Sequence, residues 1–199
     1  MTLPDRLLLL TDASQARLPL REVVAAAIGG GARAVLLREK HLPSVERAGV
    51  AAALAEVVHR VGGTFLVAGG LDDPRVRVDG VHLAAREPLP AVLPPVVGRS
   101  CHDPRALARA AAEGCTYATL SPIFPSASKP GYGPALGPGA LRGAPMPVYA
   151  LGGVDAARAA DCVAAGAYGV AVMGAVMRAE DPAAVVAGLV AALHVRATR

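Results

Sequence analysis

Eight short apolar runs, separated by segments with helical periodicity, constrain this sequence more than any other feature. The runs are almost wholly apolar rather than alternating, which is typical of parallel strands covered on both faces. They are Leu7–Leu10, Ala34–Leu37, Thr64–Val67, Gly80–Leu83, Val96–Gly98, Tyr117–Leu120, Val148–Leu151 and Gly169–Val172. We therefore expect eight strands of one parallel sheet.

Alanine-rich amphipathic segments fill most of the gaps between these runs. They are Leu20–Ile28, Ser44–Val61, Pro104–Glu113, Ala156–Ala165 and Pro182–Val195. Asp103, Asp155 and Asp181 stand directly before three of them, where an N-cap acid begins a helix. The gap at 71–78 contains Asp72-Asp73-Pro74 and the gap at 87–95 contains four prolines, which predict short or irregular connections instead of helices.

Alternating strands and helices predict an α/β protein, built as either an open doubly wound sheet or a closed barrel. Eight units in 199 residues favour a single (β/α)8 TIM barrel near the smallest size of that fold. No linker divides the chain, so we expect one domain over residues 1–199. Hydrophobic residues make up 53% and aromatic residues 3%, which predicts a core of Ala, Val and Leu with almost no large rings.

The charge distribution favours a small anionic ligand. The net charge is +4, but the basic residues are scattered singly, whereas nucleic-acid binding needs clustered Lys and Arg. The three cysteines form no CxxC pair, and the apolar run near the N-terminus, four residues long, is too short for a signal sequence or a membrane span. We therefore expect a cytoplasmic protein that binds neither nucleic acid nor membrane.

The carboxyl ends of the strands are where a TIM barrel places its active site. Gly152-Gly153 follow the seventh run and Met173-Gly174 follow the eighth. Phosphate frequently binds between these two loops, because small residues expose backbone N–H groups there. The sequence therefore predicts a phosphate site at these four residues, and we expect a larger residue at Gly153 to enter the phosphate space.

Lysine and serine residues near other strand ends suggest a second anion site. Of the 20 Lys and Arg residues only two are lysines, Lys40 and Lys129, and both follow a strand. The long loop 121–137 is rich in Pro, Gly and Ser and contains Ser126 and Ser128 beside Lys129. Loops of this length in compact domains are often functional, although a plain surface loop is an alternative interpretation.

Two histidines lie near strand ends, where a proton shuttle is useful. His102 follows the fifth run, and His82 lies in the fourth. A structural role inside the barrel is at least as good an interpretation for His82. Cys101 neighbours His102 but faces the opposite way on a strand, so the two do not form a nucleophile pair. No metal-binding spacing occurs in the sequence.

Six phrases at the strand ends resemble the thiamine-phosphate synthase and TenI superfamily, in order along the chain. They are Leu37–Lys40 (LREK), Asp79–Leu83 (DGVHL), Gly98–His102 (GRSCH), Ser121–Ser126 (SPIFPS), Ala150–Val154 (ALGGV) and Gly169–Met173 (GVAVM). The resemblance implies a barrel that binds the thiazole phosphate half of thiamine. The synthase joins that half to a hydroxymethylpyrimidine diphosphate with Mg²⁺, whereas TenI-type relatives isomerise the thiazole phosphate.

The resemblance also implies roles for individual residues. Gly153 and the loop after the eighth strand would hold the thiazole phosphate. The second ligand would lie against Arg38, Lys40, Ser100, Ser126, Ser128 and Lys129. Glu87 matches one of the acids that bind the metal in the synthase, so it is the candidate Mg²⁺ ligand if the chain is a synthase.

The chain departs from both branches of the superfamily. The synthase has Gln where this chain has Leu36 and a metal-binding Asp where it has Gly69, while tautomerases have their histidine where it has Pro122. The missing carboxylate favours a TenI-like thiazole phosphate isomerase that uses His102 and no cofactor. A divergent synthase and a non-catalytic thiamine-phosphate-binding or regulatory protein are the alternatives. The sequence does not distinguish a monomer from a homo-oligomer.

Overall fold

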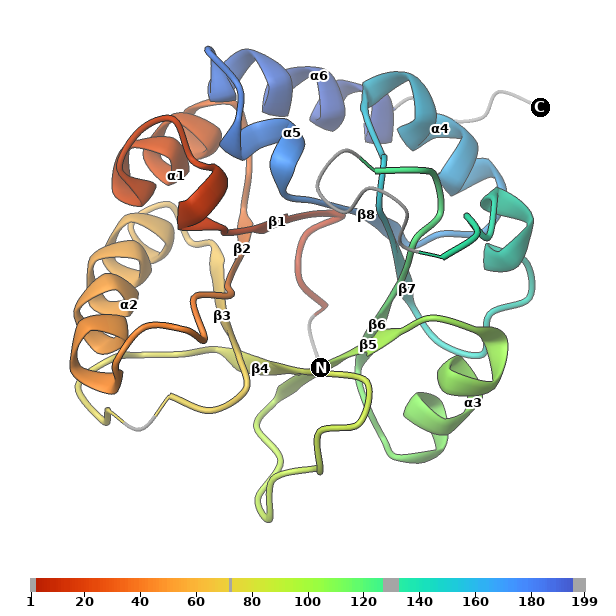
Figure 1. Ribbon diagram of the computed structural model, residues 1–199, viewed down its shortest axis with the longest axis horizontal. Coiled ribbons are helices and arrows are strands. Elements are labelled where there is room, and N and C mark those ends of the chain that lie inside the picture. Colours follow the sequence, from red (N-terminus) through yellow and green to blue (C-terminus); the bar gives the residue numbers. More distant parts are fainter. Residues whose placement is uncertain (1–2, 72, 127–132, 195–199) are drawn as a thin grey trace.

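Eight parallel strands close into a barrel in the computed structural model, which describes residues 3–71, 73–126 and 133–194 (Figure 1). The strands follow one another around the ring in chain order, each paired in parallel with the next, and β1 pairs with β8. They are β1 (Leu7–Leu10), β2 (Ala34–Leu37), β3 (Thr64–Ala68), β4 (Gly80–Leu83), β5 (Val96–Cys101), β6 (Tyr117–Leu120), β7 (Val148–Leu151) and β8 (Gly169–Val172). The predicted TIM barrel is confirmed.

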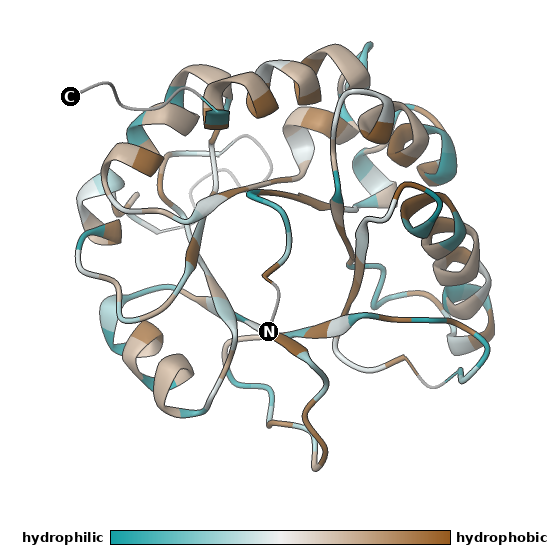
Figure 2. Ribbon diagram, turned by 180° about the vertical axis from the view of Figure 1, so that it is seen from behind, coloured by the Kyte–Doolittle hydropathy of each residue, from teal (hydrophilic) through white to brown (hydrophobic). Residues whose placement is uncertain are grey.

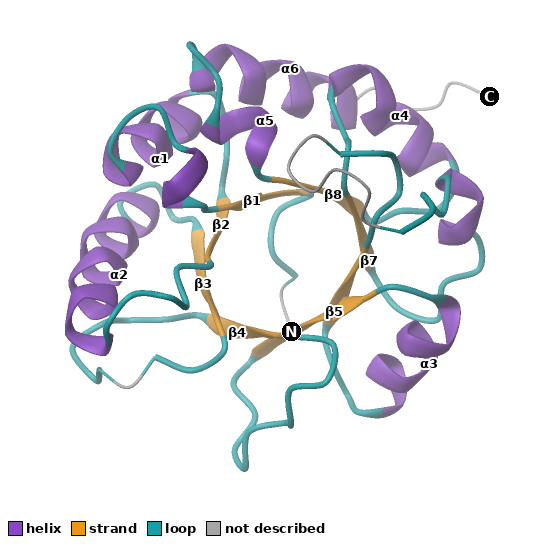
Figure 3. Ribbon diagram, in the orientation of Figure 1, coloured by secondary structure: helices purple, strands orange, loops and turns teal. Residues whose placement is uncertain are grey.

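Helices lie around most of the barrel, but loops whose described residues form no helix connect β3 to β4 and β4 to β5 (Figure 3). The helices are α1 (Leu20–Gly29), α2 (Ser44–His59), α3 (Pro104–Ala112), α4 (Ala156–Ala164), α5 (Gly174–Met177) and α6 (Pro182–His194), with 3-10 turns η1 (Ala13–Gln15) and η2 (Pro138–Leu141). The side chains of Asp103 and Asp155 accept hydrogen bonds from the backbone N–H groups of Ala106 and Arg158, so these caps are as predicted. No helix in the described part of the chain has the length and composition needed to cross a membrane.

Two differences from the sequence prediction affect the site. Strand β5 continues to Cys101, so Ser100 lies within the strand and not in the loop after it. The short helix α5 begins directly after β8, with Met173 as its N-cap and Gly174 as its first residue. Four residues are too few to show helical periodicity, which is why the sequence did not reveal this helix.

Two layers of apolar side chains form the core. One layer lies between the sheet and the helices, and the other fills the inside of the barrel. In Figure 2 brown, hydrophobic segments recur along the strands, and most hydrophilic residues lie in loops and on the helices. This arrangement follows from the strand pattern, since both faces of every strand are covered.

Three tyrosines lie inside the barrel, although the composition had predicted a core almost without rings. Tyr117 and Tyr149 are fully buried, and the rings of Tyr117, Tyr149 and Tyr168 form successive edge-to-face pairs with centroids 5.3 Å apart. A Cβ atom at Gly98 would lie only 2.1 Å from Cζ of Tyr117. A glycine in β5 therefore makes room for the ring.

Candidate functional site

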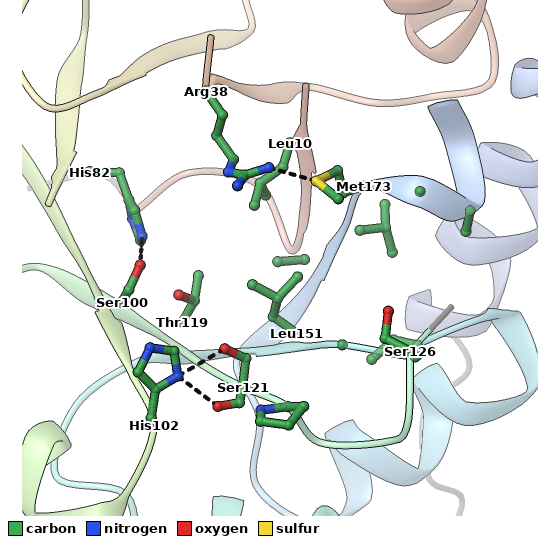
Figure 4. A pocket seen from close by; sticks show the side chains of 18 of the residues that line it. Leu10, Arg38, His82, Ser100, His102, Thr119, Ser121, Ser126, Leu151 and Met173 are labelled. Atoms are coloured by element: carbon green, nitrogen blue, oxygen red, sulfur yellow. Dashed lines mark hydrogen bonds between the residues drawn. The ribbon is translucent and has the colours of Figure 1, made fainter. Parts of the chain in front are cut away.

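A cavity of about 700 Å³ opens at the carboxyl ends of the strands (Figure 4). Its volume lies within the usual range for small-molecule sites. The polar side chains that line it are those of Arg38, Lys40, His82, Ser100, His102, Thr119, Ser121, Ser126, Asp155, Arg158 and Arg178. Because four of them are Arg or Lys and only one is acidic, the cavity favours an anionic ligand.

The loops after β7 and β8 meet at one corner of this cavity. Gly152, Gly153, Met173 and Gly174 all line it, so the structure brings together the four residues predicted to hold phosphate. Gly152 and Gly153 have φ values of 95° and 63°, a conformation that side chains with a Cβ rarely adopt. The first N–H groups of α5 have no carbonyl partner within the helix, so that of Gly174 is available to an anion.

A larger residue at Gly153 would meet the loop after β6. A Cβ atom there would lie 2.3 Å from the carbonyl oxygen of Pro125 and 2.8 Å from Cβ of Phe124, so it would collide with this loop. The expectation that a larger residue also enters the phosphate space stays a prediction. Substituting Gly153 would disturb the backbone at this corner, whatever the ligand.

Two basic side chains from the loop after β2 reach the cavity. Nη1 of Arg38 donates a hydrogen bond to Sδ of Met173 at 2.6 Å. A thioether is a weak acceptor, so a phosphate oxygen would be a better partner for this guanidinium. Nζ of Lys40 lies 2.8 Å from Oε2 of Glu87, in the loop after β4.

Glu87 is held on several sides. Its Oε2 also accepts the N–H of Ala84 at 2.9 Å, and Nη1 of Arg99 donates to its carbonyl oxygen at 2.7 Å. Burial raises the pKa of Glu87, but the hydrogen bonds from Ala84 and Lys40 outweigh it and hold this pKa below its usual value. The carboxylate is therefore ionised and paired with Lys40 at neutral pH.

The described residues do not fit a protein-held divalent cation. No group of three or more His, Cys, Asp or Glu side chains in the described part of the chain is arranged to hold a metal. Gly69 stands at the position where the resemblance implies a carboxylate. A Cβ atom there would lie 3.0 Å from Oε1 of Glu87 and 3.1 Å from Nζ of Lys40, so a side chain at this position would neighbour both groups. Glu87, the predicted Mg²⁺ ligand, is thus a lone carboxylate already paired with an ammonium group.

The predicted acid–base residue lies at the cavity wall. Nδ1 of His102 is 2.8 Å from the carbonyl oxygen of Ser121 and 3.3 Å from its Oγ. Since a carbonyl can only accept, the shorter contact places a hydrogen on Nδ1. Cys101 is fully buried on the other face of the strand, as expected.

The remaining candidates divide into two groups. Ser100 and Ser126 line the cavity. Ser128 and Lys129 lie outside the described residues, so their predicted contact with the second ligand stays a prediction. His82 is buried, with Nε2 2.9 Å from Oγ of Ser100 and Nδ1 3.0 Å from the hydroxyl of Tyr117.

Arg158 is a cavity residue that the sequence analysis missed. It lies in the first turn of α4, and its Nη1 donates to the carbonyl oxygen of Gly153 at 2.7 Å. Its guanidinium carbon is 5.0 Å from the centroid of the Phe124 ring. The sequence did contain a signal for this residue. A cation in the first turn of a helix interacts unfavourably with the helix dipole, so an arginine at this position indicates a role other than stabilising the helix.

Comparison with known proteins identifies the family. The family model described as thiamine monophosphate synthase matches residues 7–176. The chain belongs to this family. It is 40% identical to the thiamine-phosphate synthase of Methanoculleus marisnigri over 78% of this chain and 79% of the relative. It is 36% identical to the thiamine-phosphate synthase of Mycobacterium bovis, with 94% of each chain covered.

A solved structure agrees with this assignment. The thiamine phosphate pyrophosphorylase from Pyrococcus furiosus superposes with a TM-score of 0.82 at 27% identity, covering 94% of this chain and 95% of that one. The resemblance predicted from the strand-end phrases is therefore confirmed, and the chain is a member of an enzyme family of thiamine biosynthesis. The names of these relatives agree with the synthase alternative better than with the isomerase that the sequence had favoured.

Proposed function

We propose that this protein is a thiamine-phosphate synthase, which joins a thiazole phosphate to a hydroxymethylpyrimidine diphosphate. In this transfer the bond between the methylene carbon of the pyrimidine and the diphosphate oxygen breaks. The diphosphate leaves with the bonding electron pair, and the thiazole nitrogen forms a C–N bond to the same carbon. The names of the relatives support this reaction over isomerisation.

The observation that carries the proposal is that cationic side chains line one cavity in two regions, each of which could bind an anion. Lys40 lies beside the loop after β4, whereas Gly153 and Arg158 lie beside the ends of β7 and β8. In a closed ring of eight strands, β4 and β8 are on opposite sides. An isomerase that binds one thiazole phosphate needs only one such region, but a synthase with two phosphorylated substrates needs both.

We assign the substrates to these regions by charge. The diphosphate, with the larger charge, would lie against Lys40 and Arg38, whose cations would stabilise the charge that develops as it leaves. Arg38, whose Nη1 contacts Sδ of Met173, would lie between the two substrates. The thiazole phosphate would lie at the corner of Gly152, Gly153, Met173 and Gly174, with Arg158 beside it. Ser126, and by resemblance Ser128 and Lys129, would complete the second-ligand site from the loop after β6.

Mg²⁺, which the synthase resemblance implies, enters no step of this proposal. Among the residues that the structure describes, Glu87 is the carboxylate paired with Lys40, and Gly69 contributes no side chain. Mg²⁺ is usually held by one or two carboxylates together with substrate phosphates, and here the carboxylate of Glu87 is already paired with an ammonium group. We therefore assign the neutralisation of the diphosphate to Arg38 and Lys40.

Isomerisation of the thiazole phosphate is the second candidate function. The observation in its favour is the imidazole of His102 at the wall of the same cavity. Histidine is the side chain that most often transfers protons in enzymes, and His102 is placed where it could contact a ligand in the cavity.

Simultaneous binding of the two substrates tests the proposal. Calorimetry with a non-reactive pyrimidine diphosphate analogue and with thiazole phosphate should find one site for each, without competition. Lys40→Met should weaken only the diphosphate, and Arg158→Met only the thiazole phosphate. Each loss should be about tenfold or more, as expected for a hydrogen bond to a charged group. Competition between the two ligands for one site would contradict the two-substrate assignment.

A further inference from the structure

Three neighbouring strands bring a histidine and a tyrosine together beneath the cavity. The register pairs His82 of β4 with Gly98 of β5, and Gly98 with Tyr117 of β6. Gly98 has no side chain, and a Cβ atom there would lie 2.5 Å from Nδ1 of His82 and 2.4 Å from the hydroxyl oxygen of Tyr117. The two side chains therefore meet over Gly98, with Nδ1 and the hydroxyl 3.0 Å apart.

Ser100 connects this pair to the cavity. It lies two residues beyond Gly98 on the same strand, so it faces the same side. Its Oγ is 2.9 Å from Nε2 of His82 (Figure 4). Tyr117 contacts the other ring nitrogen, Nδ1. Ser100 and His82 both line the cavity, whereas Tyr117 is fully buried.

Burial determines the protonation states of His82 and Tyr117 at neutral pH. Burial, with the charges of Arg38 and Lys40, lowers the pKa of His82 to about 3, so the imidazole carries one hydrogen at neutral pH. Burial raises the pKa of Tyr117, which therefore keeps its hydroxyl hydrogen. Among the described residues, Nδ1 of His82 is the one acceptor found for that hydrogen.

Only one tautomer of His82 allows Tyr117, His82 and Ser100 to form both hydrogen bonds. If Nδ1 accepts from Tyr117, the imidazole hydrogen is on Nε2 and is donated to Oγ of Ser100. The other tautomer would leave the hydroxyl hydrogen of Tyr117 buried without an acceptor, which should disfavour it by roughly tenfold or more. Since Oγ of Ser100 already accepts from His82, its own hydrogen is left for a group in the cavity.

We propose that Tyr117 and His82 are positioning residues that fix Ser100 as a hydrogen-bond donor to the ligand. The cavity then favours, at Ser100, a ligand atom that accepts a hydrogen bond, such as a ring nitrogen or a phosphate oxygen. This inference concerns specificity at the proposed synthase site, but its first test does not depend on that function.

The tautomer of His82 can be measured without a ligand. ¹⁵N NMR of protein labelled at histidine, with the signal assigned by His82→Gln, should show a neutral imidazole protonated at Nε2 at pH 7. A neutral imidazole protonated at Nδ1, or a charged imidazolium, would overturn the proposal. The tautomer is read from the unmodified chain and His82→Gln serves only to assign the signal, so the result does not depend on the folding of variants at Tyr117 or Ser100.

A double-mutant cycle then tests whether Tyr117 acts through Ser100. Affinity for the pyrimidine diphosphate analogue and for thiazole phosphate is measured by calorimetry. For the ligand that contacts Ser100, Tyr117→Phe should weaken binding by about threefold to tenfold, and it should have no further effect in the Ser100→Ala background. Equal effects of Tyr117→Phe in both backgrounds, or none in either, would overturn the proposal.

Tyr149→Phe is the matched control for this cycle. It also removes a buried hydroxyl from the barrel, but that hydroxyl donates to the carbonyl oxygens of Pro4 and Asp5 at the far end. It should leave ligand affinity and the His82 spectrum unchanged. If neither ligand binds the unmodified protein, the proposed synthase function fails, while the NMR result still decides the tautomer.

Discussion

The absence of a carboxylate at Gly69 predicts that ligand binding is nearly independent of Mg²⁺. A cation beside Glu87 would have to displace or approach the ammonium of Lys40, which lies 2.8 Å from the carboxylate. Repulsion between a divalent and a monovalent charge about 4 Å apart costs about 2 kcal/mol even in water. Removing Mg²⁺ should therefore change the affinity for the pyrimidine diphosphate by less than about threefold.

Gly69→Asp should create the dependence that the natural chain lacks. A Cβ atom at this position would lie 3.0 Å from Oε1 of Glu87, so the new carboxylate would be its neighbour. Attraction between this charge and a Mg²⁺ ion about 4 Å away is about 2 kcal/mol in water, or roughly thirtyfold in affinity. The φ value of 70° at Gly69 strains any side chain there, and Asp tolerates it better than most residues.

Gly69→Asn separates the charge from the strain, because it has the same shape and the same backbone cost. Calorimetry with the pyrimidine diphosphate analogue, in Mg²⁺ and then in chelator, should find a large difference for Gly69→Asp and almost none for Gly69→Asn or the natural chain. A loss of tenfold or more when Mg²⁺ is removed from the natural chain would refute the reasoning.

Two further predictions concern stability. Because the pKa of Glu87 is lowered in the folded protein, its ionised carboxylate increases the free energy of unfolding. This contribution is fully present above the ordinary pKa of 4.5 and is lost as the pH falls through the pKa of the folded state. Glu87→Gln should therefore flatten the acid side of the stability profile, by less than about 1 kcal/mol because the Lys40 pair is partly exposed; an unchanged urea titration at pH 3 to 7 would contradict this. Gly98→Ala should lower the melting temperature by overpacking against Tyr117, at a cost of about 1–3 kcal/mol or more. The control Gly49→Ala, which meets nothing within 4 Å in α2, should raise it; a Gly98→Ala variant as stable as the parent would show that β5 has room for a side chain.

The strands, and the meeting of the loops after β7 and β8, could be predicted because their signals are local. Continuous apolar runs identify strands covered on both faces, and a closed order of such strands brings the loops after β7 and β8 together. Gly152-Gly153 and Met173-Gly174 were therefore predictable as neighbours although they are far apart in the sequence.

Contacts across the barrel could not be predicted in the same way. Lys40 and Glu87 come from loops whose paths have no periodic pattern, so their 2.8 Å contact becomes visible only in three dimensions. The meeting of His82 and Tyr117 depends on the register of three strands and on the missing side chain of Gly98. Low aromatic content likewise predicted a core without rings, whereas the few tyrosines are concentrated inside the barrel.

The most direct test of the proposed function is a product assay with both substrates. Purified protein is incubated with thiazole phosphate and hydroxymethylpyrimidine diphosphate, and thiamine phosphate, diphosphate and the thiazole phosphate isomers are quantified by chromatography. We predict equal amounts of thiamine phosphate and diphosphate, abolished when Arg38 and Lys40 are both replaced by methionine. Interconversion of the thiazole phosphate isomers without thiamine phosphate would contradict the synthase assignment and identify the isomerase.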